Sequence, residues 1–221
     1  MARALVIGAS GGIGQALVAA LHARGDAVTG LSRSVDGLDV TDEASIRAAL
    51  APLTAPFQTV IVATGALEIM GAAPEKSLAR LDPSALAAQF ALNSIGPALV
   101  LKHALRLLPR DAPARLAVLS ARVGSIGDNR LGGWYSYRAA KAALNQLVHT
   151  AAIEIARTHP QAVVACLHPG TVATPFTEKY LGTHPAVPPD EAAQNLLAVL
   201  DSLTPAQTGG FFDWQGKAVP W

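Results

Sequence analysis

The sequence predicts an α/β fold, in which one doubly wound parallel sheet lies between two layers of helices (a three-layer αβα arrangement) in a single domain spanning residues 1–221. Three observations predict it. The length of 221 residues fits one domain, and a chain that is 51% hydrophobic and 15% charged is too apolar to remain disordered. Short apolar runs also alternate with alanine- and leucine-rich stretches, which is typical of repeated βαβ units.

The first elements of this pattern surround a glycine-rich turn. Residues 3–8 form a short apolar run that ends in glycine, which indicates a buried strand. A glycine loop follows, and then a helix over residues 15–24 that glycine ends. We expect a second strand over 26–33, a short third strand over 37–40, and then a helix whose N-cap is Thr41.

The rest of the chain continues the alternation. Strands are expected over residues 59–63, 115–120, 162–167 and 209–213. Helices are expected over residues 83–108, 137–158 and 190–203, and the first of these is interrupted near Gly96 and Pro97. Because strands alternate with helices, the strands should be parallel and the helices should cover both faces of the sheet.

Charge and composition exclude several classes of protein. The 17 Lys and Arg against 16 Asp and Glu leave a net charge of +1, so no basic field points to nucleic acid. No apolar run reaches the roughly 18 residues of a membrane-spanning helix, and the start of the chain lacks the apolar region of a signal peptide. The one cysteine, Cys166, excludes an internal disulfide, and the histidines lack metal-ligand spacing. We therefore expect a cytoplasmic protein without a nucleic-acid, membrane or metal partner.

The loop between the first strand and the first helix, Gly8-Ala-Ser-Gly-Gly-Ile-Gly14, is a candidate nucleotide site. Glycine lets the backbone approach a pyrophosphate, and the helix N-terminus offers free N–H groups and the positive end of its dipole. In a strand–loop–helix context the motif favours a dinucleotide; a glycine-rich turn without a ligand is the alternative. The candidate residues are Gly8, Ser10, Gly11, Gly12, Ile13 and Gly14.

The end of the second strand favours NADP(H) over NAD(H). A carboxylate there normally binds a ribose 2′-hydroxyl, but this strand ends in Leu31-Ser32-Arg33-Ser34 and reaches no acid before Asp36. Arg33 can face a 2′-phosphate with a charge-assisted hydrogen bond, and Ser32 and Ser34 can add their hydroxyls. The alternative is that Arg33 is an ordinary solvated arginine.

A tyrosine and a lysine four residues apart, Tyr137 and Lys141, should lie on one face of the helix over residues 137–158. A phenol with a pKa of about 10 is a poor base at neutral pH, and a nearby ammonium would lower that pKa. The pair would then act as an acid/base on a carbonyl or alcohol oxygen. Taken alone, such a pair is more often only a helix face.

Several motifs in sequence order make the chain resemble the short-chain dehydrogenase/reductase family over essentially its whole length. They are the glycine loop, Asp39-Val40, Ala63-Thr64-Gly65, Asn93-Ser-Ile-Gly-Pro97, Tyr137-x-x-x-Lys141 and Pro169-Gly170. The stretches Gly124-Ser-Ile-Gly-Asp-Asn129 and Trp134-Tyr-Ser-Tyr137 make it similar to the C-factor or sniffer-like subgroup of small carbonyl reductases. The fold that the resemblance implies is of the Rossmann type.

The resemblance implies an NADP-dependent oxidoreductase that transfers a hydride between the nicotinamide and the carbon of a small-molecule carbonyl or alcohol. Tyr137 would donate the proton in reduction, Lys141 would lower the tyrosine pKa and bind the nicotinamide ribose, and Asn93 would hold a kinked helix and a water of the proton relay. The implied cofactor contacts are Asp39 and Val40 at the adenine, Ala63, Thr64 and Gly65 at the floor of the site, and Pro169, Gly170, Val172 and Thr174 at the nicotinamide and pyrophosphate.

One family residue is absent from its expected place. The family pattern Ser-Ser-x-x-Gly here reads Ser120-Ala121-Arg122-Val123-Gly124, so alanine stands where a serine would polarise the substrate oxygen. We expect Ser125 to replace it. The alternatives are Ser120, which alternation along a strand points to the other face, or no serine at all.

The substrate side and the assembly are also expected from the resemblance. Trp134 and Tyr135 either form a wall of the substrate pocket or only pack on the helix start, and residues 176–189 would form a mobile substrate loop. Relatives pair through the two long helices, which correspond here to residues 83–108 and 137–158. A homodimer or homotetramer is therefore expected.

A second class of function stays open. A dinucleotide-binding regulatory or signalling protein with little turnover would explain the missing serine, but it would not need both Tyr137 and Lys141. A sugar-nucleotide epimerase shares the tyrosine–lysine pair but needs a larger C-terminal substrate domain than 221 residues allow.

Overall fold

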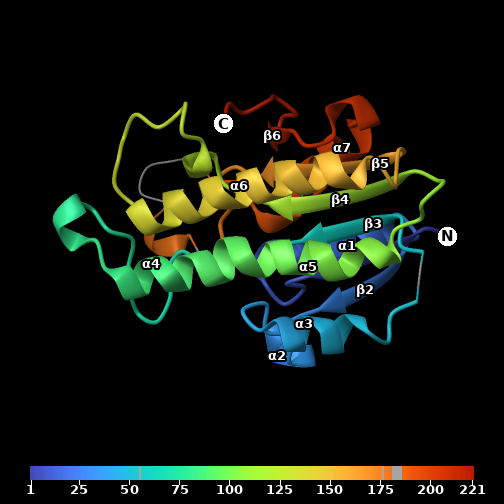
Figure 1. Ribbon diagram of the computed structural model, residues 1–221, viewed down its shortest axis with the longest axis horizontal. Coiled ribbons are helices and arrows are strands. Elements are labelled where there is room, and N and C mark those ends of the chain that lie inside the picture. Colours follow the sequence, from blue (N-terminus) through green and yellow to red (C-terminus); the bar gives the residue numbers. More distant parts are fainter. Residues whose placement is uncertain (55, 176, 181–185) are drawn as a thin grey trace.

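Six parallel strands form one sheet in the computed structural model, which describes residues 1–54, 56–175, 177–180 and 186–221. The strand order is β2-β1-β3-β4-β5-β6, and the chain extends the sheet in opposite directions on the two sides of β1 (Figure 1). This doubly wound arrangement confirms the predicted α/β class. The strands are β1 (Arg3–Ile7), β2 (Ala27–Leu31), β3 (Thr59–Val62), β4 (Ala114–Leu119), β5 (Ala162–His168) and β6 (Phe211–Asp213).

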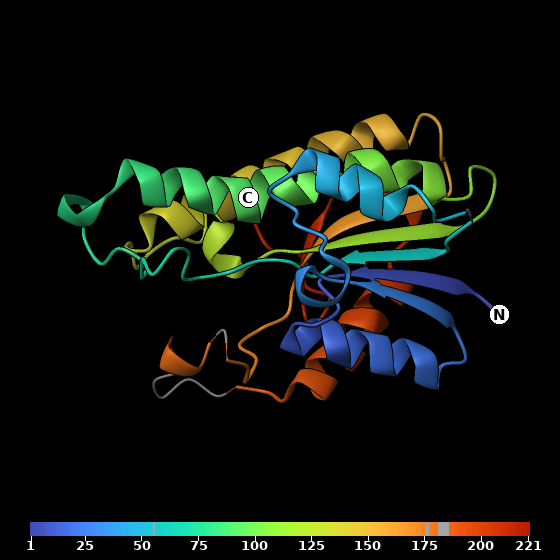
Figure 2. The same cartoon turned by 90° about the horizontal axis from the view of Figure 1, so that it is seen from below.

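Helices cover both faces of this sheet, as Figure 2 shows: α3, α5 and α6 lie over one face, and α1 and α7 lie over the other. The helices are α1 (Gly12–Ala23), α2 (Arg33–Asp36), α3 (Glu43–Leu50), α4 (Pro83–Phe90), α5 (Gly96–Ala104), α6 (Tyr135–Ile155) and α7 (Pro189–Ser202). A π-helical turn over Ala91–Ile95 joins α4 to α5 without breaking the helical path.

Two apolar clusters fill the space between the layers. Successive residues of a strand point to opposite faces, so in β1 Leu5 and Ile7 join the cluster under α5 and α6, while Ala4 and Val6 join the one under α1 and α7. Burial on both faces explains why the strands of this chain read as continuous apolar runs rather than as alternating ones.

The expected third strand over residues 37–40 is wrong. Leu38 and Val40 are buried in the larger cluster, but the backbone of this segment pairs with a side chain instead of a strand. Ser45 accepts a hydrogen bond from Asp39 N at 2.9 Å and donates one to Gly37 O at 3.1 Å. A hydroxyl therefore satisfies the groups that a sheet ladder would otherwise need.

Four predicted helix starts also move, and two of them are those of α1, which begins at Gly12 rather than residue 15, and α7, which begins at Pro189 rather than residue 190. The cap of α3 is Asp42, whose carboxylate accepts a hydrogen bond from Ala44 N at 2.9 Å, whereas the Thr41 hydroxyl donates to Asp39 instead. The long helix α6 begins at Tyr135, two residues before the predicted start. The expected strand over residues 26–33 ends at Leu31, because Ser32 caps the short helix α2.

One helical stretch, Pro83–Leu107, is long and apolar enough to cross a membrane by length and composition, with a mean hydropathy of 1.4. Such a stretch is weak evidence for a span, since core helices share these properties. Of its apolar window 39% is buried, and Val100, Leu101, Ala104 and Leu107 lie in the larger apolar cluster, so this end of the stretch packs against the core.

Candidate active site

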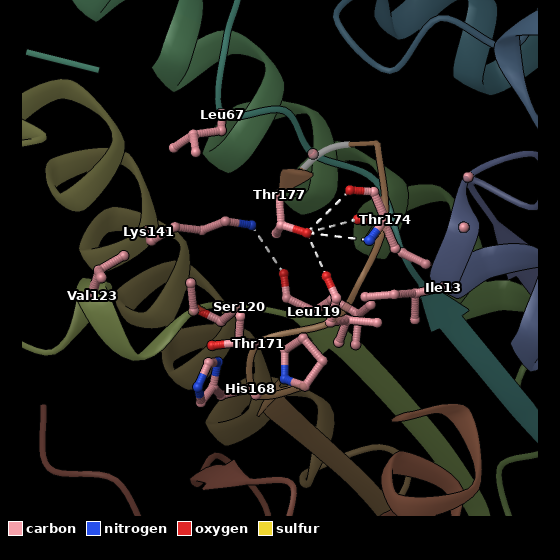
Figure 3. Close-up of a pocket in the computed structure, with 18 of the residues that line it drawn as sticks. Ile13, Leu67, Leu119, Ser120, Val123, Lys141, His168, Thr171, Thr174 and Thr177 are labelled. Carbon is pink, nitrogen blue, oxygen red and sulfur yellow. Dashed lines mark hydrogen bonds between the residues drawn. The ribbon is translucent and has the colours of Figure 1, made fainter. Parts of the chain in front are cut away.

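A cavity of about 840 Å³ lies at the carboxyl ends of the central strands. Residues 10–14, 63–65, 119–123 and 168–172 line it, and these segments follow β1, β3, β4 and β5. Side chains from α6 and from the segment after β5 complete the wall, and Figure 3 shows the labelled ones turned toward the same space. This is the place where open parallel sheets bind their ligands, at the ends of strands on either side of the switch in strand order.

The glycine loop is built by close backbone contacts. A Cβ on Gly14 would lie 2.1 Å from Gly8 O, and a Cβ on Gly8, at φ +89°, would lie 2.9 Å from the carbonyl carbon of Ala63. Only glycine lets the loop fold this tightly against β3. Five of the six predicted loop residues, Ser10, Gly11, Gly12, Ile13 and Gly14, line the cavity, whereas Gly8 lies behind them as a packing residue.

The start of α1 is suited to an anionic ligand. Its N-cap is Gly11, no side chain caps it, and its first turn has no acidic residue. The N–H groups and the positive end of the helix dipole are therefore directed at the cavity. Thr64 lines the same cavity, and its buried hydroxyl makes no hydrogen bond within the described part of the chain.

The residues predicted to select the dinucleotide lie beside this loop, outside the cavity lining. Leu31 O accepts hydrogen bonds from Gly8 N at 2.8 Å and Ala9 N at 3.1 Å, which ties the end of β2 to the glycine loop. Arg33 follows it and is exposed. Ser32 is 3% exposed and uses its hydroxyl to accept from Val35 N, so its hydroxyl is occupied within the turn.

Asp39 and Val40 lie in the adjoining loop, also outside the lining. Hydrogen bonds from the Thr41 hydroxyl and then from Thr41 N hold the pKa of Asp39 below its usual value. A Cβ on Gly96 would lie 2.6 Å from Val40 O and would clash with it. Glycine at the start of α5 therefore lets this loop pack against the helix.

Asn93 lies in the π-helical turn and is fully buried. Its amide nitrogen donates to Ala66 O at 2.8 Å and to Gln89 Oε1 at 2.6 Å, and its Oδ1 accepts from Ala66 N at 3.2 Å. The interruption predicted near Gly96 is thus a π-turn, a feature frequent at functional sites. Asn93 holds the loop after β3 in place beneath the cavity.

The predicted pair Tyr137 and Lys141 is brought together in the cavity wall. The two side chains are 6% and 3% exposed, and Lys141 Nζ lies 5.9 Å from the centroid of the Tyr137 ring. Lys141 Nζ also donates to Leu119 O at 3.0 Å, as Figure 3 shows. Gly65 adjoins them, since a Cβ there would lie 2.8 Å from Asn93 Oδ1 and 3.6 Å from Lys141 Nζ.

The expected direction of the tyrosine pKa is wrong for this structure. Burial raises the pKa of the Tyr137 phenol above its ordinary value, and burial lowers the pKa of Lys141 to about 8. Both shifts have one cause, because a low-dielectric surrounding disfavours the charged form of each group.

The structure does not bring Ser125 into the cavity lining. Ser125 is 2% exposed, and its hydroxyl accepts a hydrogen bond from Asp128 N at 3.1 Å. Ser120 lies at the cavity wall, but its hydroxyl donates to Asn145 Oδ1 at 2.6 Å. Ala121 itself faces the cavity, so the position of the family serine presents a methyl group there.

Of the two aromatic residues considered for the pocket wall, Trp134 and Tyr135, the first lines the cavity. Trp134 meets the rings of Tyr137 and Tyr180 edge-on, at centroid distances of 6.3 and 5.6 Å. Tyr135 is 36% exposed and is absent from the described lining. Of the expected substrate loop, residues 176 and 181–185 lie outside the described residues, whereas Thr177 and Tyr180 line the cavity.

Several residues of the site were missed from the sequence. His168, which the motifs did not single out, lines the cavity, where burial lowers its pKa to about 4. Its place at the end of a strand, directly before Pro169 and Gly170, is the signal that could have identified it. Tyr180 donates to Glu68 Oε1 at 2.6 Å, a contact between segments more than a hundred residues apart that no local pattern reveals.

The remaining predicted cofactor residues Pro169, Gly170, Val172 and Thr174 follow β5 and line the cavity, together with Ala63, Thr64 and Gly65 opposite them. A Cβ on Gly12 would lie 2.8 Å from Thr174 Cγ2, so the segment after β5 closes directly over the glycine loop. The cavity is thus enclosed between the start of α1 and this segment.

A doubly wound sheet with a glycine loop after its first strand and a buried tyrosine–lysine pair beside it defines a class of Rossmann-like oxidoreductases. The family model for short chain dehydrogenase matches residues 2–184. The chain therefore belongs to the short-chain dehydrogenase family, as its motifs predict.

Individual relatives extend over most of the chain. A 1-hydroxy-2-glutathionyl-2-methyl-3-butene dehydrogenase of Rhodococcus sp. (strain AD45) is 31% identical over 233 residues, covering 100% of both chains. The C-signal protein of Myxococcus xanthus is 36% identical over 146 residues, covering 66% of this chain and 84% of that protein. The structure of an NADPH-bound carbonyl reductase from chicken fatty liver superposes with a TM-score of 0.84 at 26% identity, over 99% of this chain and 98% of that chain.

Proposed function

We propose that this chain is an NADP-dependent, carbonyl reductase-like oxidoreductase that transfers a hydride between a nicotinamide and the carbon of a small carbonyl or alcohol, with Tyr137 as acid/base. One observation carries the proposal: Tyr137 and Lys141 are buried in the wall of the cavity into which the glycine loop opens. The Rhodococcus dehydrogenase and the chicken carbonyl reductase, similar over nearly the whole chain, support it.

The residues around the cavity fit a dinucleotide. The uncapped start of α1, with residues 10–14, would hold its pyrophosphate, and Lys141 would bind the nicotinamide ribose. Pro169, Gly170, Val172 and Thr174 would enclose the nicotinamide, with Thr64 on the facing wall. When bound, the cofactor supplies the hydride in reduction or accepts it in oxidation.

Tyr137 would hold and deliver the proton at its phenol oxygen. Burial raises the pKa of this phenol, so it is protonated at neutral pH and holds the proton that a carbonyl oxygen would receive. Lys141, whose ammonium donates a hydrogen bond to Leu119 O, would return a proton to the Tyr137 phenolate. Asn93 would hold the loop after β3 in place beside these two side chains.

The substrate end of the cavity is apolar. Leu67, Val123, Leu131 and Trp134 line it, so the cavity suits a carbonyl carried by an apolar group. Ala121 leaves the substrate oxygen without the family's serine hydroxyl. The Tyr137 hydroxyl, which belongs to the described lining, would then donate the hydrogen bond to the substrate oxygen.

The preference for NADP(H) rests on Arg33. The nearby carboxylate of Asp36 is engaged by Ser32 N at 2.8 Å, so it is committed to α2 rather than directed at a ribose hydroxyl. Replacing Arg33 by Gln should raise KM for NADPH by about 10-fold or more and leave KM for NADH within about 2-fold, since a charge-assisted phosphate contact contributes about 1.5–3 kcal/mol. Arg80→Gln, at another exposed arginine, is the matched control. Equal effects on both cofactors would remove Arg33 from this role.

A second candidate function is a dinucleotide-binding signalling protein with little turnover. Ala121 favours it, because the cavity lacks the usual serine, and so does similarity to the C-signal protein. The burial of both Tyr137 and Lys141 favours the enzyme, since binding alone does not require a phenol beside the ammonium.

The decisive experiment measures oxidation of NADPH with a panel of apolar aldehydes, ketones and quinones. Tyr137→Phe should lower kcat by about 10²–10⁴-fold, the usual contribution of a positioned general acid, and should leave NADPH binding intact. Tyr135→Phe, an exposed tyrosine two residues away, is the control and should retain full activity. Turnover equal in wild type and Tyr137→Phe would exclude the enzymatic mechanism, and NADPH binding without turnover on any substrate would favour the signalling role.

The proposal includes a cytoplasmic location and a homodimer or homotetramer. Cell fractionation with a tagged chain tests the first. The second is tested by the mass of the assembly in solution.

A further inference from the structure

The start of α6 is capped by a residue from a distant segment. The N-cap residue Trp134 makes no side-chain cap, and the first turn of this 21-residue helix has no acidic residue. Glu75, which precedes α4 in the chain, supplies both the missing cap and the missing acidic group. Its Oε2 accepts from Ser136 N at 3.2 Å, its other carboxylate oxygen accepts from the Ser136 hydroxyl, and its main-chain oxygen accepts from Trp134 N at 2.5 Å. A negative charge at this position also complements the helix dipole.

These contacts hold Trp134 in an unfavourable backbone conformation. Its φ is +53°, in the left-handed region that bulky residues rarely adopt, and Gly132 and Gly133 before it also have positive φ. Such a conformation persists only where the surroundings determine it. The main-chain bond to Glu75 is one such determinant, and its result is that the indole stands between Tyr137 and Tyr180 in the cavity wall.

The Glu75 side chain is buried together with its hydrogen-bond partner Ser136. It is 7% exposed and Ser136 is 2% exposed, so the carboxylate is withdrawn from water and is compensated by the hydrogen bonds from α6. The same loop is fixed at its other end, where Asn93 bonds Ala66 and Gln89 Nε2 donates to Leu67 O at 2.8 Å. The loop therefore connects the π-turn to the start of the helix that carries Tyr137.

We propose that Glu75 is a positioning residue for the reaction. By capping α6 it sets the position of Trp134 and of Tyr137, one residue beyond Ser136. The proposal rests on the proposed function in one respect, that Tyr137 handles the proton. Glu75 is absent from the described lining of the cavity, so its role would be to position other residues rather than to contact the reacting groups.

The test compares Glu75→Gln with Asp82→Asn. Asp82 also caps a helix with its carboxylate, accepting from Ala85 N at 2.7 Å at the start of α4, but it lies outside the cavity. Glu75→Gln removes the charge and turns one acceptor into an amide donor facing α6. We expect kcat to fall about 10- to 100-fold, the scale of a misplaced catalytic group, with the Kd for NADPH changed less than about 2-fold. Asp82→Asn should leave kcat and Kd unchanged.

A second readout does not depend on turnover. Hydrogen exchange in the peptide spanning residues 132–139 should accelerate in Glu75→Gln and stay at the wild-type rate in Asp82→Asn. Unchanged exchange there would overturn the cap, and faster exchange with unchanged kcat would overturn the positioning role. If Tyr137→Phe retains full activity, the proposed function fails instead, and the exchange experiment still decides the cap.

If Glu75→Gln does not fold, Ser136→Ala tests the same contact from the other side. It removes the hydroxyl donor and keeps the carboxylate. It should lower kcat in the same direction without altering the Kd for NADPH, and an unchanged kcat in a folded Ser136→Ala would again overturn the proposal.

Discussion

At the scale of single residues, the site combines one missing hydroxyl with two buried titratable groups. Ala121 presents a methyl group to the cavity, and the neighbouring serines are bonded elsewhere, to Asn145 and Asp128. Tyr137 and Lys141 are buried together, so their protonation is governed by desolvation. Each feature leads to a substitution with a definite expected outcome.

Restoring the missing hydroxyl should raise the rate. Ala121 has an extended backbone at φ −143°, which serine adopts without strain, so Ala121→Ser places a donor at the cavity wall. We expect kcat on an apolar ketone to rise about 10-fold or more, because one donor to a developing oxyanion is worth several kcal/mol at most. Ser125→Ala is the control and should be silent. A loss in Ser125→Ala, with no gain in Ala121→Ser, would reinstate Ser125 as the donor.

The buried lysine should make stability depend on pH. Because burial lowers the folded pKa of Lys141 to about 8 from 10.5, the unfolded chain binds the extra proton between these values, and stability from this group rises as pH rises through that window. Below about pH 8 the full penalty, on the order of 3 kcal/mol, is present. Lys141→Met removes it.

Urea unfolding of wild type and Lys141→Met at several pH values between 7 and 10.5 checks this dependence. The free energy of unfolding of the variant relative to wild type should be most favourable near pH 7 and should decline steadily toward pH 10.5. A difference that does not vary with pH would show that Lys141 is not desolvated in the folded chain.

At the scale of elements, the site depends on where backbone approaches backbone. The glycine loop folds against β3, the π-turn places Asn93 under the loop after β3, and Glu75 caps α6. The first of these contacts admits no side chain, because Gly14 and Gly8 meet closely at the turn from β1 into α1. The turn is therefore sensitive to a single methyl group at one position and tolerant at another.

Gly14→Ala and Gly11→Ala should separate these two cases. A Cβ at Gly14 would lie 2.1 Å from Gly8 O, whereas one at Gly11 would lie 3.4 Å from the same oxygen, which is ordinary contact. Gly14→Ala should lower the free energy of unfolding by about 1–3 kcal/mol, as overpacking does, and Gly11→Ala should change it little. Chemical denaturation followed by circular dichroism measures both. Equal stability of the two variants would contradict the close packing of the turn.

At the scale of the whole molecule, α5 and α6 run side by side on one face (Figure 1). Apolar side chains remain exposed on the helical path there: Ile95 is 50% exposed, Leu147 41% and Ile153 52%. Association of two such faces would cover these groups, as a stable interface requires. The face is thus the expected contact between copies of this chain.

Light scattering with size-exclusion chromatography should give a mass of two or four times the 22.7 kDa chain. Ile153→Glu should shift the mass toward the single chain, because it buries a charge in the contact. Ile126→Glu, at an apolar residue 76% exposed in the loop after β4, should leave the mass unchanged. A wild-type mass of 22.7 kDa would contradict the assembly.

Local pattern was enough to predict the α/β fold, the glycine loop, the interrupted helix and the tyrosine–lysine pair. Each depends on neighbours in sequence: apolar runs for strands, glycine at a βα turn, and four-residue spacing on a helix. The short strand expected over residues 37–40 was wrong, because its apolar residues suggested a strand while the Ser45 hydroxyl bonds the backbone of Asp39 and Gly37.

The sequence by itself determined which residues are candidates for the chemistry, because composition and spacing specify side-chain types on an element. Only the tertiary structure decided their environment. It buried Tyr137 and so raised its pKa, it bonded Ser120 and Ser125 away from the cavity, and it brought Glu75 to the start of α6. Desolvation and contacts between distant segments depend on packing in three dimensions, which no spacing along the chain encodes.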